Sequence, residues 1–200
     1  IIGKNNAIIS VFPGSRKSEI EILTPIIIKF ILIMNEKYKN FQYIFHSTKT
    51  YNSLINSLIN SKDLNNCEVI SDNKIKSHVL KKSIFAIAKS GTVSLEICNA
   101  NIPSIILYKM GFINFLIIKM LVKTKFANII NIAAKEEIIP ELLQSNCNAS
   151  NIYKKVSNFL ENPNRIKDQL IRTQSVIKKL KTEKPPAELA AISLNSFLQS

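Results

Sequence analysis

Tryptophan is absent from this chain and arginine is scarce, which argues against a nucleic-acid-binding surface. Its 200 residues carry 27 Lys and Arg against 14 Asp and Glu, a formal net charge of +13. Only Arg16, Arg165 and Arg172 are arginines, whereas surfaces for single-stranded nucleic acid interleave aromatic residues with basic ones. Joint enrichment in lysine, isoleucine and asparagine is typical of an AT-rich genome. We therefore interpret most of the charge as a solvated lysine surface, with attraction to anionic lipid or to a phosphorylated substrate as the alternative.

Cysteine is also scarce, and long apolar runs are missing. Cys67, Cys98 and Cys147 are widely spaced without a Cys-x-x-Cys pattern, which predicts neither a disulfide framework nor a zinc site and favours a reducing compartment. No run reaches the roughly 18 apolar residues that span a bilayer, and no signal peptide leads the chain. The stretch 110–122 comes closest, but Lys119 interrupts it. We expect it to be either a buried helix or, with its flanking lysines, a contact with a membrane surface.

Glycine is limited to four residues, and neither of the common glycine-rich nucleotide motifs is present. The chain lacks G-x-x-x-x-G-K-[ST] and G-x-G-x-x-G, so no motif supports ATP hydrolysis or dinucleotide binding. What the chain has is an alternation of short β-branched runs with segments of helical spacing. The expected strands are 7–12, 41–45, 68–70, 84–88 and 104–108. From about residue 136 onward, helices are expected over 136–145, 150–160, 164–180 and 187–198.

This alternation predicts an α/β fold, a doubly wound parallel sheet of Rossmann-like type followed by C-terminal helices. The later strands are continuous apolar runs, as expected where helices cover both faces of a parallel sheet. The first helix has an apolar face formed by Ile20, Leu23, Ile27, Ile31 and Met34. Ser18 and Glu21 suggest a capping box at its start. The length supports one sizeable core, and because a strand follows so soon after Ile1, we expect the chain to be part of a longer protein.

Two strand, loop and helix units are candidate ligand loops. The first is Pro13-Gly14-Ser15-Arg16 and the second is Ser90-Gly91-Thr92. Open parallel sheets bind ligands where strand carboxyl ends meet helix N-termini, and free loop N–H groups with an arginine suit phosphate. Glu96 follows one turn into the second helix, in reach of the two hydroxyls of a ribose. Both loops are expected to face one ligand, although each alone is also compatible with an ordinary turn, and Glu96 with an ordinary helical acid.

Three motifs in order carry a family resemblance. The strings VFPGSRKSEIE and AKSGTVSLE, and then Asn131 followed by IIPELLQ at 138–144, resemble the C-terminal half of the lipid-A-disaccharide synthase family from about Ala7 to the end of the chain. The resemblance implies the donor-binding half of a two-domain GT-B glycosyltransferase. It implies a UDP-sugar-binding domain over 1–162 and C-terminal helices over 163–200 that pack back toward an N-terminal half, which this sequence does not include.

The same resemblance implies a reaction and a set of binding residues. The reaction is an inverting, metal-independent transfer of 2,3-diacylglucosamine from UDP-2,3-diacylglucosamine to 2,3-diacylglucosamine 1-phosphate, without a cofactor. The implied substrate-binding residues are Gly14, Ser15, Arg16, Ser90, Gly91, Thr92, Glu96, Asn131, Glu141 and Gln144. Arg16 and the second loop would face the diphosphate, Glu96 the ribose, and the last three the wall of the cleft.

The implied setting is the cytoplasm, at the surface of the inner membrane, with the C-terminal helices as a candidate homodimer contact. The general base is expected in the N-terminal half, so we interpret His46 and His78 as structural or surface residues rather than catalytic ones. The family usually has arginine where this chain has Glu136, and the neighbouring Lys135 offers only a point charge in its place.

Two other interpretations stay open at this point. One is another UDP-sugar protein of the same architecture, such as a UDP-N-acetylglucosamine epimerase or a cell-wall precursor glycosyltransferase, against which the PELLQ segment argues. The other is a basic module without chemistry, binding membrane or nucleic acid, or the remnant of a decayed gene.

Overall fold

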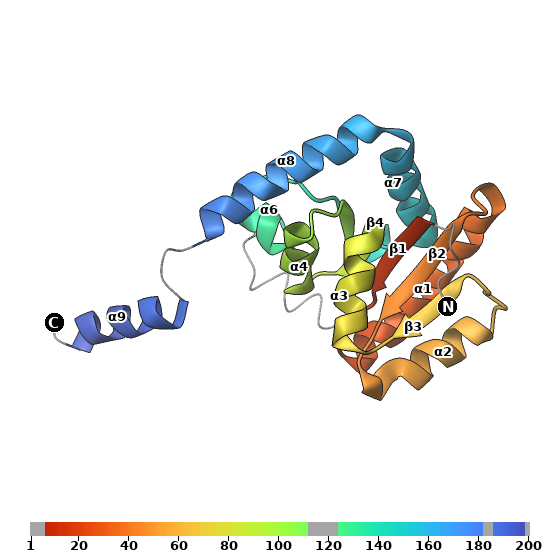
Figure 1. Cartoon of the computed structure of the whole chain (residues 1–200), viewed down its shortest axis with the longest axis horizontal. Coiled ribbons are helices and arrows are strands. Elements are labelled where there is room, and N and C mark those ends of the chain that lie inside the picture. Colours follow the sequence, from red (N-terminus) through yellow and green to blue (C-terminus); the bar gives the residue numbers. More distant parts are fainter. Residues whose placement is uncertain (1–6, 112–123, 182–185, 199–200) are drawn as a thin grey trace.

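A parallel sheet with helices on both faces forms the body of the molecule (Figure 1). The computed structural model describes residues 7–111, 124–181 and 186–198. Its strands are β1 (Ala7–Phe12), β2 (Phe41–His46), β3 (Cys67–Ile70), β4 (Ser83–Lys89), β5 (Ser104–Tyr108) and β6 (Glu141–Leu143). Its α-helices are α1 (Lys17–Lys37), α2 (Asn52–Asn60), α3 (Asn73–Lys82), α4 (Val93–Asn99), α6 (Ile129–Ala134), α7 (Ala149–Glu161), α8 (Pro163–Leu180) and α9 (Pro186–Leu198). The predicted doubly wound α/β fold is confirmed.

The strand order places a crevice at the centre of the sheet. The described strands lie in the order β3-β2-β1-β4-β5-β6, and each neighbouring pair is parallel. From β1 the chain winds outward to β3, and it then returns to β4 and winds outward on the other side. The carboxyl ends of β1 and β4 are therefore the point where the winding reverses, which is where open α/β sheets bind ligands.

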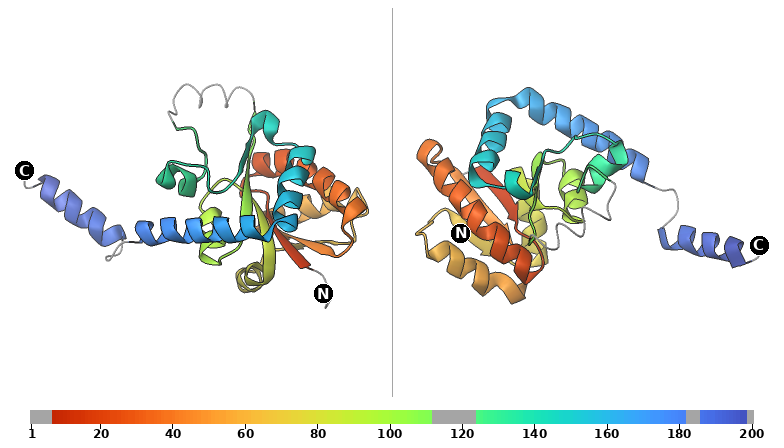
Figure 2. Two further views of the ribbon diagram at one scale, coloured as in Figure 1. Left: turned by 90° about the horizontal axis from the view of Figure 1, so that it is seen from above. Right: turned by 180° about the vertical axis from the view of Figure 1, so that it is seen from behind.

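Alternate residues of the central strands supply two separate cores. On β4, Phe85 and Ile87 pack into the core beneath α1, α2 and α7, whereas Ala86 and Ala88 pack beneath α4, α6 and α8. The two helical layers are visible in Figure 2. The predicted apolar face of α1 is fully buried. Burial on both sides explains why these strands read as continuous apolar runs rather than as alternating ones.

Two local expectations are wrong. The helix expected over 136–145 does not form. α6 ends at Ala134, because its C-cap residue Lys135 adopts the left-handed conformation (φ 59°), and the chain then adds β6 to the edge of the sheet beside β5. The capping box at the start of α1 is formed by Glu19 and not by Glu21, since Arg16 is the N-cap residue and Glu19 lies three positions after it. Ser18 lies within the first turn of the helix.

The three later C-terminal helices form close to their expected positions. α8 packs on this domain through Val176 and Ile177, which lie in the core shared with α4 and α6, while α9 stands apart from the body in both figures. The expectation that residues 163–200 pack back toward an N-terminal half stays a prediction. Most of the apolar stretch 110–122 lies outside the described residues. No helix in the described ranges combines the length and apolar character that crossing a membrane requires.

Candidate functional site

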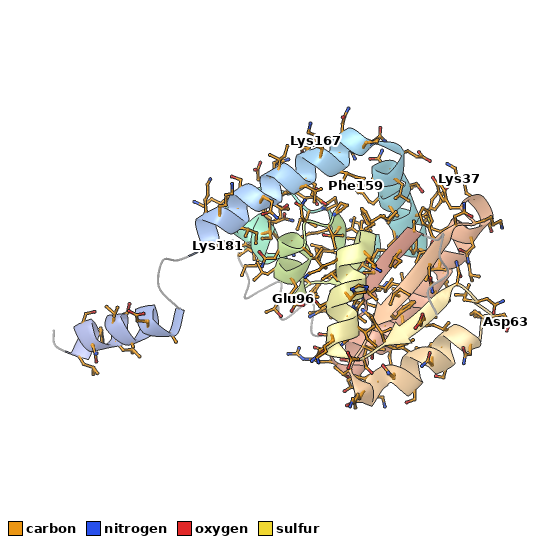
Figure 3. The ribbon with its side chains drawn as sticks, in the orientation of Figure 1. Lys37, Asp63, Glu96, Phe159, Lys167 and Lys181 are labelled. Atoms are coloured by element: carbon orange, nitrogen blue, oxygen red, sulfur yellow. The ribbon has the colours of Figure 1, made fainter. Side chains whose placement is uncertain are left out.

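A cavity opens at the carboxyl ends of the central strands. It has a volume of about 730 Å³ and lies between α3 and α4. Phe12, His46 and Lys89, each the last residue of its strand, line it together with both predicted loops. Among the residues predicted to bind substrate, those that line it are Gly14, Ser15, Ser90, Gly91, Thr92 and Glu96. Figure 3 labels Glu96 on α4, next to α3.

The first loop is organised by a carboxylate that it surrounds. Glu19 Oε2 accepts hydrogen bonds from the backbone N–H of Ser15 at 3.1 Å and of Arg16 at 3.4 Å. Lys89 Nζ lies 2.9 Å from Glu19 Oε1. Burial opposes the charge of Glu19, but Lys89 and the two amides outweigh burial, so the pKa of Glu19 is lowered. The N–H groups of Ser15 and Arg16 are thus used by Glu19 rather than free, and the predicted contact of this loop with phosphate stays a prediction.

Gly14 permits this close approach. Its φ of +123° is a conformation that residues with a Cβ rarely adopt, and a Cβ at this position would lie 2.6 Å from Glu19 Oε2 and 2.8 Å from Glu19 Cβ. The second contact is with an atom close to the helix backbone, so a side chain could not be accommodated by moving only the carboxylate. The glycine of the PGSR motif is needed for the shape of the loop.

Gly14→Ala should therefore destabilise the loop. Strained backbone and displacement of Glu19 are expected to lower the free energy of unfolding by about 1.5 kcal/mol, measured by urea denaturation of the 200-residue chain. Gly111→Ala is the matched control, since no atom of the described residues lies within 4 Å of a Cβ built there. Equal unfolding midpoints for the two variants would contradict this account of the loop.

The second loop presents N–H donors that no described residue accepts from. Ser90 is fixed at both ends, since its N–H donates to the Leu107 carbonyl and its hydroxyl donates to the Ala127 carbonyl at 2.6 Å. The N–H groups of Gly91 and Thr92 donate to no acceptor in the described part of the chain. The carboxylate of Glu96 is exposed at the same cavity. Held rigidly beside an open cavity, these amides are suited to an anion and Glu96 to a pair of hydroxyls.

Positive charge reaches the cavity from lysines. Lys76 and Lys81 of α3 line it beside Lys89, and Lys89 also lies over the ring of Tyr108, 5.6 Å from its centroid. Arg16 is not among the lining residues, and its side chain is 80% exposed. The predicted contact between Arg16 and a diphosphate stays a prediction, whereas Lys89 already occupies the position between the two loops.

Asn131, Glu141 and Gln144 lie elsewhere, at the junction of α6 and β6. Asn131 is fully buried. Its side chain accepts from the N–H groups of Ile138 and Ile139, both at 2.9 Å, and donates at 2.7 Å to the Ile139 carbonyl and to Glu141. None of the three lines the cavity. Their predicted role in the wall of a cleft stays a prediction, while the contacts made by Asn131 give it a structural role.

The remaining contacts of this group are with the main chain or with α8. Glu141 also accepts from the N–H groups of Ala127 and Asn128, and Gln144 accepts from the N–H of Met110 at 3.4 Å. Glu136, at the position where the resemblance leads us to expect arginine, pairs with Arg172 of α8 at 2.8 Å. In this chain an arginine therefore lies beside that position, although it comes from another helix.

Sequence reasoning missed Glu19, Lys89 and the α3 side of the cavity, and it did not assign His46 to the site. Lys89 and His46 carry a usable signal, because each is a polar residue that directly follows a buried apolar run at the end of its strand. Glu19 carries a weaker one, since it follows the loop glycine at the spacing that lets a carboxylate reach back to loop amides.

Comparison with known proteins gives consistent results. Residues 1–192 match the family model described as Lipid-A-disaccharide synthetase. The lipid-A-disaccharide synthase of Rickettsia prowazekii is 34% identical over 193 residues, which cover 95% of this chain and 50% of that protein. The chain thus spans about half of the length of the curated relatives it matches.

Solved structures share the fold at low sequence identity. The C-terminal domain of a group 1 glycosyl transferase (LpcC) from Francisella tularensis has a TM-score of 0.59 at 12% identity, over 89% of this chain and 87% of that domain. MnaA of S. aureus, in a co-structure with UDP, has a TM-score of 0.61 at 14% identity, over 90% of this chain and 48% of that one. The fold is thus that of glycosyltransferase domains, and with the sequence matches it follows that the chain belongs to the lipid-A-disaccharide synthase family.

Proposed function

We propose that this chain is the donor-binding half of a lipid-A-disaccharide synthase. The complete enzyme would transfer 2,3-diacylglucosamine from UDP-2,3-diacylglucosamine to 2,3-diacylglucosamine 1-phosphate and release UDP, which makes it a hexosyltransferase of lipid A biosynthesis. Family membership supports this assignment, and it makes an epimerase or a nucleic-acid-binding module less attractive. The 200 residues would bind the nucleotide of the donor, and an N-terminal half would supply the acceptor site and the general base.

One observation carries the proposal: two loops, unused amides, a lysine and a carboxylate converge on one cavity. In the proposed complex, the N–H groups of Gly91 and Thr92 hold the diphosphate, and Lys89, which lines the same cavity, supplies positive charge. Glu96 accepts hydrogen bonds from the ribose hydroxyls. A related fold solved with UDP, MnaA of S. aureus, is consistent with a nucleotide in this domain.

The chemistry of these residues suits the departure of UDP. When an acceptor hydroxyl attacks the anomeric carbon, the bond from that carbon to the diphosphate oxygen breaks and negative charge collects on the leaving group. Fixed N–H donors and a lysine beside that oxygen stabilise the developing charge without reorganising. The lysine is partly shielded, since 23% of its side chain is exposed, and this strengthens its interaction with an anion.

The position in the cell and the assembly are parts of the same proposal. Lipid substrates place the enzyme at the cytoplasmic surface of the inner membrane, where the lysine-rich surface of this chain would meet anionic headgroups. Residues 163–200 would pack toward the N-terminal half or contribute to a homodimer. Exposed apolar residues on α9, among them Ile192 and Leu194, are consistent with such a contact.

Titration with UDP by calorimetry tests the site. Glu96→Ala is expected to weaken UDP binding about 10-fold, because a carboxylate that pairs with ribose hydroxyls contributes roughly 1.5 kcal/mol. Glu36→Ala is the control, since Glu36 is an exposed residue of α1 outside the cavity. Unchanged UDP affinity in Glu96→Ala would mean that Glu96 does not contact the ribose. A folded wild-type chain that does not bind UDP would contradict the proposed nucleotide site itself.

The same titration separates the two candidate cations. If Lys89 meets the diphosphate, Lys89→Ala weakens UDP binding more than Arg16→Ala, and the difference shrinks when uridine replaces UDP. The reverse order would favour the contact between Arg16 and the diphosphate that the family resemblance implies.

A further inference from the structure

His46 lines the cavity, and none of the proposed contacts with the nucleotide involves it. It is the last residue of β2, only 5% of it is exposed, and its ring stacks on Phe12 with 4.1 Å between the ring centroids. Both rings line the cavity. The proposed diphosphate and ribose contacts come from the second loop and α4, so His46 contributes to a different part of the cavity.

A chain of buried hydroxyls determines which ring nitrogen carries the proton. Ser83 Oγ donates to the Val79 carbonyl at 2.9 Å, which uses its single hydrogen. The contact of 2.7 Å between Ser83 Oγ and Ser10 Oγ is therefore donated by Ser10. Ser10 Oγ, its own hydrogen used, must accept at 2.8 Å from Nε2–H of His46. The neutral ring is thus protonated on Nε2, and Nδ1 presents a lone pair.

The other nitrogen of the ring is left without a partner. Nδ1 of His46 is buried and has no hydrogen bond within the described part of the chain. Burial and then the nearby charge of Lys76 lower the pKa of His46 to about 3, so the ring stays neutral and Nδ1 is not itself protonated. A buried polar atom without a partner is unfavourable. Because His46 lines the cavity, a ligand bound there is a source of the missing hydrogen-bond donor.

The chemistry of Nδ1 restricts what that group can be. A lone pair pairs with an N–H or O–H donor, and it repels phosphate oxygens, which only accept hydrogen bonds when ionised. Within a uridine nucleotide, the imide N–H of the base and the ribose hydroxyls are the neutral donors. The diphosphate is excluded from this position and belongs at the unused amides of the second loop.

We infer that Nδ1 of His46 accepts a hydrogen bond from the nucleoside of the bound nucleotide, either from the imide N–H of the base or from a ribose hydroxyl that does not donate to Glu96. The inference rests on the proposed nucleotide site. If the donor is the imide, His46 also selects the base, because cytosine has an unprotonated acceptor nitrogen at that ring position.

Nitrogen NMR of the 200-residue chain, labelled with ¹⁵N in its histidines, tests this without a mutation. Before ligand, the Nδ1 resonance of His46 should lie in the range of an unprotonated nitrogen and that of Nε2 in the protonated range. Addition of UDP should move the Nδ1 resonance toward the protonated range, as expected for a nitrogen that accepts a hydrogen bond, while the exposed His78 stays unchanged. An Nδ1 resonance that does not respond at saturating UDP overturns the inference.

A variant measures the contribution to binding. The amide nitrogen of glutamine is as many bonds from Cα as Nε2 of histidine, so His46→Gln keeps a donor for Ser10 and removes the Nδ1 acceptor. It is expected to weaken UDP binding 5- to 10-fold, whereas the control His78→Gln binds as the wild type does. Wild-type affinity in a folded His46→Gln overturns the inference alone. No UDP binding by the folded wild-type chain overturns the proposed site and this inference together.

Three analogues of UDP identify the donor. With CDP as the probe, the imide assignment predicts that the wild type prefers UDP and that His46→Gln loses most of this preference. With 2′-deoxy-UDP and 3′-deoxy-UDP, the hydroxyl assignment predicts that the penalty for one deoxy analogue disappears in His46→Gln. If each analogue weakens binding by the same factor in the wild type and in His46→Gln, His46 does not contact the nucleoside and the inference is overturned.

Discussion

Asn131→Leu is expected to lower the free energy of unfolding by about 4 kcal/mol. The side chain of Asn131 is fully buried and makes four hydrogen bonds, three with the main chain of Ile138 and Ile139 and one with Glu141. Leucine has a similar volume but leaves two buried N–H donors and a carbonyl without partners, each costing about 1–3 kcal/mol. Urea denaturation followed by circular dichroism measures the change.

A control variant and a measurement of UDP affinity distinguish a structural role of Asn131 from a role in binding. Asn60→Leu makes the same chemical change at an exposed position at the end of α2, and it should alter stability by less than about 0.5 kcal/mol. Near-wild-type stability combined with a large loss of UDP affinity would instead support the cleft-wall role that the family resemblance implies for Asn131. Low stability with near-normal affinity in the fraction that stays folded would support the structural role.

The strands could be predicted because burial on both sides leaves a direct mark in the sequence. Runs such as the one in β4 are apolar throughout, and their ends are set by polar or turn residues, so β1 and β5 were predicted at their exact bounds. The helical face of α1 follows from the spacing of its apolar residues. Both signals are local, since they depend on residues within a few positions of one another.

The edge strand β6 could not be predicted from the same local signals. Ile138, Ile139 and Leu142 have a spacing that also fits a helix, which explains why a helix was expected over 136–145. The strand forms because the main chain of Pro140 accepts from Ile106 and Leu142 pairs with Leu107 across the edge of the sheet. These partners are more than 30 positions apart in the sequence, and local spacing contains no information about them.

The candidate site shows the same division between local and distant information. The two loops and Glu96 could be predicted because each is a short motif directly after a strand. The ion pair between Lys89 and Glu19 joins the end of β4 to the first turn of α1, two segments that are 70 positions apart in the sequence. The proton chain from His46 likewise joins β2, β1 and the start of β4. Long-range contacts decide which loop amides remain available.

Stability should fall as the pH is lowered from 7.5 to 5.0, by about 2 kcal/mol. Burial lowers the pKa of His46 to about 3 in the folded chain, whereas an unfolded histidine titrates near about 6.5. Below that pH, His46 binds a proton in the unfolded state but not in the folded state. The contribution is therefore complete above about pH 6.5 and is lost by about 1.4 kcal/mol per unit as the pH falls toward 3.

Urea midpoints at several pH values, with two variants, assign this effect to one residue. His46→Gln has no titrating group at this position, so most of its loss of stability between pH 7.5 and 5.0 should disappear, while His78→Gln should keep it. Carboxylates contribute little to the change in stability between pH 7.5 and 5.0, because they titrate mostly below about pH 5. An equal pH dependence in His46→Gln and the wild type would mean that His46 can be protonated in the folded chain. The ring would then have a second partner or access to water, and the tautomer derived from the hydroxyl chain would no longer hold.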